Sequence, residues 1–149
     1  MKQQTLAMAA DQGFERHRKP TRRDVFLETM SRVVPWEAMC TAVEPYYPKK
    51  GNGRPPIGLE RMLRIHFLQH WFNLADLACE EALYDSASLR RFAGIDLGCE
   101  AVPDATTMLK FRRLLEQRKL QDSTMRARNA IACTVLRRMV NARSCSRSD

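Results

Sequence analysis

The sequence predicts an all-α domain of about six short helices, with a flexible N-terminal segment and a basic, disordered C-terminal tail. Apolar residues recur at helical spacing along the chain, and before residue 117 no alternating strand pattern of useful length occurs. Capping and turn residues separate the apolar segments at short intervals. Since 149 residues are about one domain, we divide the chain into a segment 1–20, a helical domain 21–117 and a tail 118–149.

Residues 53–72, GRPPIGLERMLRIHFLQHWF, predict the central helix of this domain. A turn signal opens the stretch, and the helix is expected from about residue 57 to residue 72. Leu59, Met62, Leu63 and Phe67 fall at i, i+3, i+4 spacing. Other apolar residues widen this stripe to most of the circumference, and a helix of that kind is normally buried on several sides.

Two helices are expected before the central one. Thr21 is suited to cap the first of them, with Asp24 in the position that completes a capping box. Pro35 fits the first turn of a second helix, 36–43. Prolines then stop that helix, and the loop 46–56, YYPKKGNGRPP, leads to the central helix.

Three helices are expected after it. Residues 73–76 end the central helix, and a helix with an apolar face follows. Asp85 or Ser86 then caps a short helix that ends at Gly94. Asp104 is a natural N-cap for a last helix, 105–117. Residues 131–140 of the tail are compatible with one more amphipathic helix, and the end of the chain has no core-forming residues.

The net charge of +8 is unevenly distributed. Residues 1–116 hold 17 basic and 15 acidic residues, whereas residues 117–149 hold 8 basic and 2 acidic ones. Residues 16–54 form a second basic region, with nine basic and four acidic residues. Basic segments beside a helical domain favour a polyanionic partner, nucleic acid first, and the alternative is a solubilising charged surface.

The basic residues near the predicted helices are the candidate contacts to DNA phosphates, which give affinity without sequence choice. The set is Arg22, Arg23, Lys49, Lys50, Arg54, Arg61, Arg64, Lys110, Arg112 and Arg113. The helices around residues 85 and 104 can form a unit like a helix-turn-helix, but the sequence assigns no recognition helix.

Candidate metal and catalytic groups are weaker signals. His66 and His70 stand four residues apart, the spacing for a shared metal, with Cys79 or Glu80 as a third ligand; we favour structural histidines, since zinc sites need three or four ligands. The acidic group Glu80, Glu81 and Asp85 suggests Mg²⁺, yet a solvated face and a helix cap explain it better. The five cysteines form no CxxC pair and, without a secretory signal, indicate a reducing cytoplasm.

Four blocks in a fixed order resemble a known family: VVPW at 33–36, GRPPIGLERMLRIHFLQHWFNL at 53–74, EEALYDSASLRRFAGIDL at 80–97 and VPDATTMLKFRRLLEQ at 102–117. Together they resemble the N-terminal region of InsH-like transposases, the IS-five group of bacterial insertion-sequence enzymes. The resemblance implies a helical domain that recognises terminal inverted repeats and helps to pair subunits. In the family it precedes a ribonuclease-H-like domain, whose Asp-Asp-Glu triad binds divalent metal, Mg²⁺.

The resemblance ends at residue 117. The family continues with a strand that carries the first catalytic Asp, whereas residues 118–149 match nothing expected, and Asp104 belongs to a helix cap. We therefore hypothesise a truncated or frameshifted transposase without catalytic residues or a cofactor of its own. The family is enzymatic, but we expect this chain alone not to catalyse transposition. Sequencing the downstream DNA for the missing strand motif in another frame tests this hypothesis.

The expected function is binding to element-end DNA and self-association, in the bacterial cytoplasm at the nucleoid, with full-length transposase as another partner and no membrane. The alternative is an oligomerisation module without DNA affinity, in which helices 57–72 and 105–117 pair subunits, or an inhibitor of full-length transposase.

Overall fold

The computed structural model describes residues 18–53, 55–118 and Arg126. Within these residues the chain forms six α-helices and a 3₁₀ turn, and no strand. The elements are α2 (Arg22–Val33), α3 (Trp36–Val43), η1 (Glu44–Tyr46), α4 (Leu59–Trp71), α5 (Asp76–Asp85), α6 (Ala87–Ala93) and α7 (Ala105–Gln117). The predicted all-α class is therefore confirmed. The expectations for residues 1–17 and for the tail 119–149 other than Arg126 lie outside the described residues.

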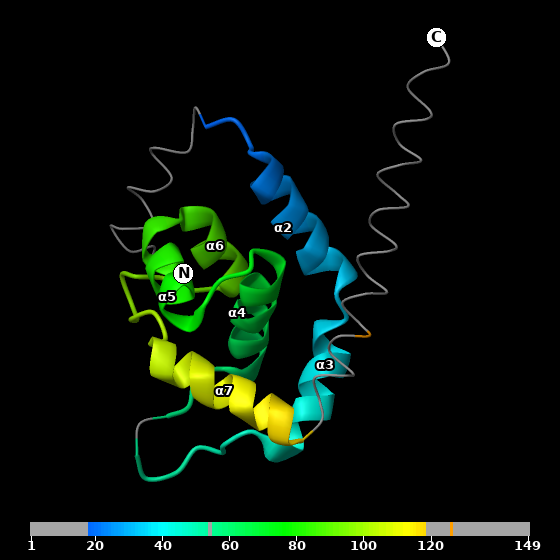
Figure 1. The fold of residues 1–149 in the computed structure, drawn as a ribbon, viewed down its shortest axis with the longest axis vertical. Helices are drawn as coiled ribbons and strands as arrows, with labels where there is room; N and C mark the ends of the chain where they lie inside the picture. Colours follow the sequence, from blue (N-terminus) through cyan, green and yellow to red (C-terminus); the bar gives the residue numbers. More distant parts are fainter. Residues whose placement is uncertain (1–17, 54, 119–125, 127–149) are drawn as a thin grey trace, which may run out of the picture.

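Helix α4 is the centre of the domain, as its apolar circumference predicts. It packs against α3, α5, α6 and α7, and Figure 1 shows it between α2 and α3 on one side and α5 and α6 on the other, with α7 across one end. Seven of its thirteen residues are buried, among them Leu63 and Leu68, which are 0% exposed. Burying such side chains contributes about 1.5–3 kcal/mol each.

An aromatic cluster joins the first helices to α4 and α6. Trp36 packs edge-on against Phe67 and Phe92, with ring centroids 5.5 and 5.8 Å apart. Trp71 likewise contacts Phe26, Phe67 and Phe92 at 5.2–5.7 Å. Edge-to-face pairs at these distances add about 0.5–1.5 kcal/mol each beyond burial, so this cluster holds α2 and α3 on the rest of the domain.

The predicted helix boundaries hold within two residues. The central helix begins at Leu59 rather than at residue 57, since Gly58 is its N-cap, and it ends at Trp71 because Asn73 adopts a left-handed conformation, φ 51°. Pro35 is the N-cap of α3 and lies just before its first turn. Ser86, rather than Asp85, caps α6, and Gly94 ends it at φ 73°, a conformation that favours glycine.

None of the described helices is long and apolar enough to cross a membrane.

Candidate nucleic-acid interface

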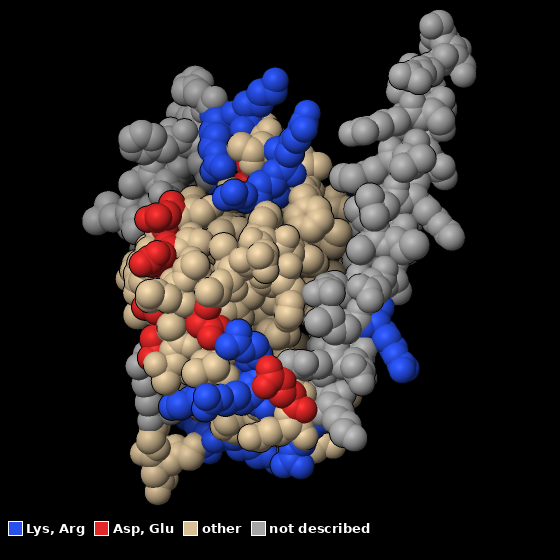
Figure 2. Space-filling view, in the orientation of Figure 1, with Lys and Arg blue, Asp and Glu red and all other residues tan. Residues whose placement is uncertain are grey.

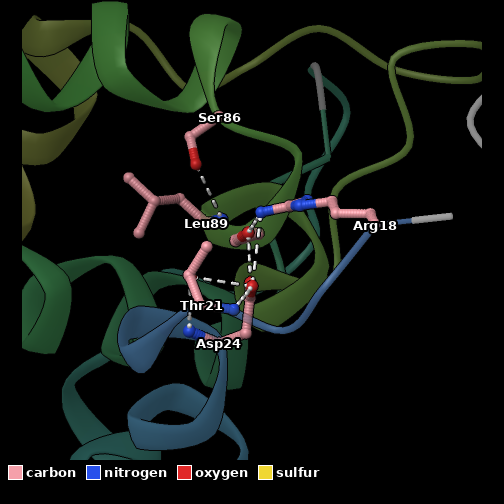
Figure 3. Close-up of polar contacts among 6 residues, drawn as sticks. Arg18, Thr21, Asp24, Ser86 and Leu89 are labelled. Carbon is pink, nitrogen blue, oxygen red and sulfur yellow. Dashed lines mark hydrogen bonds and ion pairs between the residues drawn. The ribbon is translucent and has the colours of Figure 1, made fainter. Parts of the chain in front are cut away.

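The start of α2 is fixed by a polar network that reaches α6 (Figure 3). The carboxylate of Asp24 accepts hydrogen bonds from the backbone N–H and the hydroxyl of Thr21, both at 2.8 Å, which completes the predicted capping box. Ser88, buried on α6, donates its hydroxyl to the same carboxylate. Arg18 donates to Ser88 at 2.9 Å and pairs with Asp24 at 3.3 Å.

This network keeps Asp24 ionised. The hydrogen bond from Ser88, followed by the backbone N–H of Thr21, lowers the pKa of Asp24 from 3.8 to about 2.

A cavity of about 470 Å³ lies beside the network and brings together Arg18, Arg64 and Arg91 with Asp24 and Glu28. Because its lining carries both charges, the cavity does not define a site for one class of ion.

The first two predicted DNA contacts, Arg22 and Arg23, begin α2 and are exposed. The guanidinium of Arg23 lies over the ring of Phe72, 5.4 Å from its centroid. Neither arginine forms an ion pair with a described residue, so both charges are available to a partner at this end of the domain.

Lys49 and Lys50 lie exposed in the loop between η1 and α4. The hydroxyl of Tyr47 donates to the carbonyl of Ile57 at 2.5 Å, which ties the two ends of this loop together. The ring of Tyr47 packs on Phe111 of α7, with centroids 6.0 Å apart, and burial raises the pKa of its phenol. The loop is therefore anchored beside α7. Arg54, the remaining predicted contact in this loop, lies outside the described residues.

Helix α7 separates its apolar and basic residues onto different faces. Asp104 caps it, as predicted, by accepting from the backbone N–H of Thr107 at 3.0 Å. Met108, Phe111 and Leu115 are buried against the domain, whereas Lys110 and Arg113 are exposed.

Arg118 follows α7 and lies over the ring of Tyr46, 4.9 Å from its centroid. It is exposed and extends the basic surface beyond the predicted set. We assigned Arg118 to the tail, whereas the structure makes it the C-cap of α7, with its backbone N–H donating to the carbonyl of Leu114 at 3.3 Å.

Three other predicted contacts are engaged inside the domain. Arg61 pairs with Glu100 at 2.5 Å and donates to the carbonyl of Gly94 at 2.8 Å. Arg112 pairs with Asp76 at 2.9 Å and thereby joins α7 to α5.

Arg64 is the most enclosed of the three, with 17% of its side chain exposed. It bonds Glu60, the hydroxyl of Ser31 and the carbonyl of Phe92. These three arginines stabilise the fold, and their role as phosphate contacts stays a prediction.

The exposed residues among the predicted contacts, together with Arg118, thus form two groups. Figure 2 shows Lys and Arg side chains over the start of α2 at one end of the domain, and over α7 and the nearby loop at the other. We call the second group the α7 end and define it by Lys49, Lys50, Lys110, Arg113 and Arg118. Figure 2 shows an acidic side chain among the basic ones at this end, so the α7 end is mainly but not wholly positive.

The candidate metal ligands are held in side-chain contacts. The Nε2 atoms of His66 and His70 lie 3.1 Å apart, and His66 is buried. Glu80, a proposed third ligand, accepts instead from the backbone N–H of Ala105 at 2.8 Å and so supports the start of α7. Within the described residues, no group of three or more His, Cys, Asp or Glu side chains is placed to hold a metal ion.

Comparison with known proteins finds a matching family model. The family model described as Transposase domain (DUF772) matches residues 14–114, more than half of the chain. The chain therefore belongs to this family of transposase domains, and the expected relationship to insertion-sequence transposases is confirmed. The narrower InsH-like grouping stays a prediction. No solved structure matches the chain.

Proposed function

We propose that this domain binds duplex DNA at the ends of an insertion sequence through its exposed basic residues, with Lys49 and Lys50 in contact with phosphates. The observation that carries the proposal is the α7 end. Lys49, Lys50, Lys110 and Arg113 are exposed there and form no ion pair with a described residue. Membership of a transposase family makes DNA the polyanion expected at such a surface.

Binding to phosphates has a quantitative signature. Each neutralised phosphate steepens the fall of log K with log salt by about 0.9. If Lys49 and Lys50 each contact one phosphate, replacing both by alanine reduces the slope by about 1.8. The test is a gel-shift or anisotropy titration of the full chain on terminal-repeat DNA between about 50 and 200 mM salt. Over that range, wild type should lose about 12-fold more affinity than the double variant.

Arg112 is the matched control for this experiment, because its charge is already paired with Asp76. Arg112→Gln should leave the salt slope unchanged in protein that remains folded. DNA affinity that ignores both salt and the Lys49/Lys50 substitution would refute the proposal.

The second candidate function is subunit pairing without DNA affinity, and exposed apolar residues on α5 favour it. Leu77 and Tyr84 are 61% and 46% exposed, and their i, i+7 spacing places them on one face. The expected pairing through the central helix is less accessible, since α4 is largely buried. Sedimentation equilibrium of wild type and Leu77→Glu separates the functions: pairing requires a dimer that this variant dissociates.

Strand cleavage is not part of the proposal. The hypothesis of a truncated or frameshifted transposase, with inhibition of the full-length enzyme as its consequence, rests on the sequence of the tail and stays open. Sequencing of the neighbouring DNA tests it, and absence of a catalytic frame downstream would contradict it.

A further inference from the structure

Helix α7 presents a continuous polar stripe to solvent. The exposed residues Thr106, Lys110, Arg113 and Gln117 are spaced i, i+4, i+7 and i+11. At about 100° per residue they fall within an arc of about 60°, on the side opposite the buried Met108, Phe111 and Leu115. One face of α7 therefore holds the helix on the domain, and the other is exposed among the residues that the structure describes.

The four side chains of this α7 stripe are of the types that read base edges. Arginine donates bidentately to O6 and N7 of guanine, and lysine donates to the same atoms through its single ammonium group. Glutamine bonds adenine bidentately, and threonine contacts the methyl group of thymine. Glu116 is exposed beside the stripe, and a carboxylate there repels phosphates but accepts from the amino group of cytosine. The α7 stripe and Glu116 together therefore carry the donors and acceptors that readout of base edges requires.

The dimensions also fit a DNA groove. From Thr106 to Gln117 the stripe is about 16 Å long, which corresponds to about five base-pair steps of 3.4 Å. The B-DNA major groove is about 12 Å wide and admits an α-helix.

The domain supports α7 from behind. Arg112 is paired with Asp76 of α5, and Glu80 accepts from the backbone N–H of Ala105. Contacts from α4 and α5 add to these bonds. A helix held at both its start and its middle presents its outer face in a fixed orientation, which sequence readout requires.

The flanking basic residues are placed to contact phosphates. Figure 1 shows the loop that leads into α4 running along the same end of the domain as α7, and Tyr47 ties this loop to Phe111. Lys49 and Lys50 on the loop and Arg118 after the helix thus lie near α7. Recognition helices are commonly flanked by such contacts, which set the register of the protein on DNA.

We propose that α7 is the recognition helix of this domain, with Thr106, Lys110, Arg113 and Gln117 reading base edges in the major groove of duplex DNA. The inference rests on the proposed function and adds the element and residues that choose the sequence. Lys49 and Lys50 supply affinity without sequence choice, whereas the α7 stripe supplies specificity.

The test uses the full chain and a library of randomised duplexes. Wild type should select a preferred sequence, and its affinity for that duplex is then compared with its affinity for a scrambled duplex of the same composition. Arg113→Lys keeps the charge but loses the bidentate geometry. It should reduce the ratio of the two affinities by about 5- to 150-fold, while binding to the scrambled duplex changes by less than about twofold.

The Lys49→Ala/Lys50→Ala variant is the matched control. It should weaken binding to both duplexes by the same factor and leave the ratio of the two affinities unchanged. Arg113→Ala and Gln117→Ala, verified as folded by urea titration, should change the selected sequence. If wild type binds duplexes in a salt-dependent way but selects no sequence, or if substitutions in the α7 stripe never change the ratio, the inference is refuted and the proposed function stands. Absence of binding to every duplex refutes both.

Discussion

Replacement of Arg64 by methionine tests whether this arginine stabilises the fold or binds DNA. The sequence places Arg64 among the DNA contacts, whereas its guanidinium lies inside the domain. Nη1 donates to the hydroxyl of Ser31 and to the carbonyl of Phe92, both at 3.1 Å. The guanidinium also stacks on Trp36 and Phe92, 4.5 and 5.1 Å from the ring centroids. Arg64 thus joins α2, α3 and α6 to the central helix.

The size of the effect follows from these contacts. The pair with Glu60 contributes about 0.5 kcal/mol, because Glu60 is 53% exposed. The hydrogen bonds to Ser31 and Phe92 contribute about 1 kcal/mol each, and the stacking on the two rings about 1 kcal/mol in all. Methionine retains the apolar stem but none of these contacts. We expect Arg64→Met to reduce the free energy of unfolding by about 3.5 kcal/mol.

Urea titration followed by far-ultraviolet circular dichroism measures this change. With an m-value of about 1.5–2 kcal/mol per M, the midpoint should fall by about 1.8–2.3 M. The matched control is Arg113→Met, on an exposed position of α7, which should change stability by less than about 0.5 kcal/mol.

For DNA affinity we expect the opposite ranking of the two variants, with the larger loss in Arg113→Met. Folded Arg64→Met should bind within about twofold of wild type, and Arg113→Met should bind more weakly. A loss of less than 0.5 kcal/mol in Arg64→Met, or weakened DNA binding by that variant alone, would refute the reasoning.

Three further outcomes are expected. The pKa of Asp24 is about 2 in the folded state and about 3.9 in the unfolded state. The ionised carboxylate therefore contributes fully to the free energy of unfolding above pH 5, and this contribution is lost as the pH falls toward 2. Urea midpoints at pH 7, 4 and 3 should therefore fall less steeply in Asp24→Asn than in wild type, and equal slopes would contradict this. Leu68→Ala, at a fully buried position, should cost about 2–5 kcal/mol; a thermal shift below 5 °C would argue against it. Burial raises the pKa of Cys79 to about 12, so an exposed Cys99 should react with a disulfide reagent while Cys79 reacts only in urea; equal rates in folded protein would exclude this.

Much of the fold can be predicted from the sequence because its signals are local. A capping side chain bonds the backbone three residues away, as Thr21, Ser86 and Asp104 do, and the left-handed turn at Gly94 needs only the absence of a side chain. The helical spacing of apolar residues predicts that residues 57–72 are buried on several sides, and α4 is buried in this way.

The candidate site could be predicted only as an unsorted set of basic residues. Arg61 meets Glu100, 39 residues away, and Arg112 meets Asp76, 36 residues away. Arg64 reaches Ser31 and Phe92, at separations of 33 and 28 residues. No spacing rule relates such partners, because the packing of helices brings them together.

The sequence by itself determined the all-α class, the ends of the helices and the family, since each depends on neighbouring residues or on blocks of residues in order. Only the tertiary structure decided which basic residues face solvent. Lys110, Arg112 and Arg113 lie within four residues of one helix and carry the same charge, yet Arg112 is paired with Asp76 of α5 while the other two are exposed. The physical reason is that α7 packs against α5 along one face. Arg112 lies on the side where Asp76 of α5 neutralises its charge, whereas Lys110 and Arg113 lie on the outer side and keep theirs exposed.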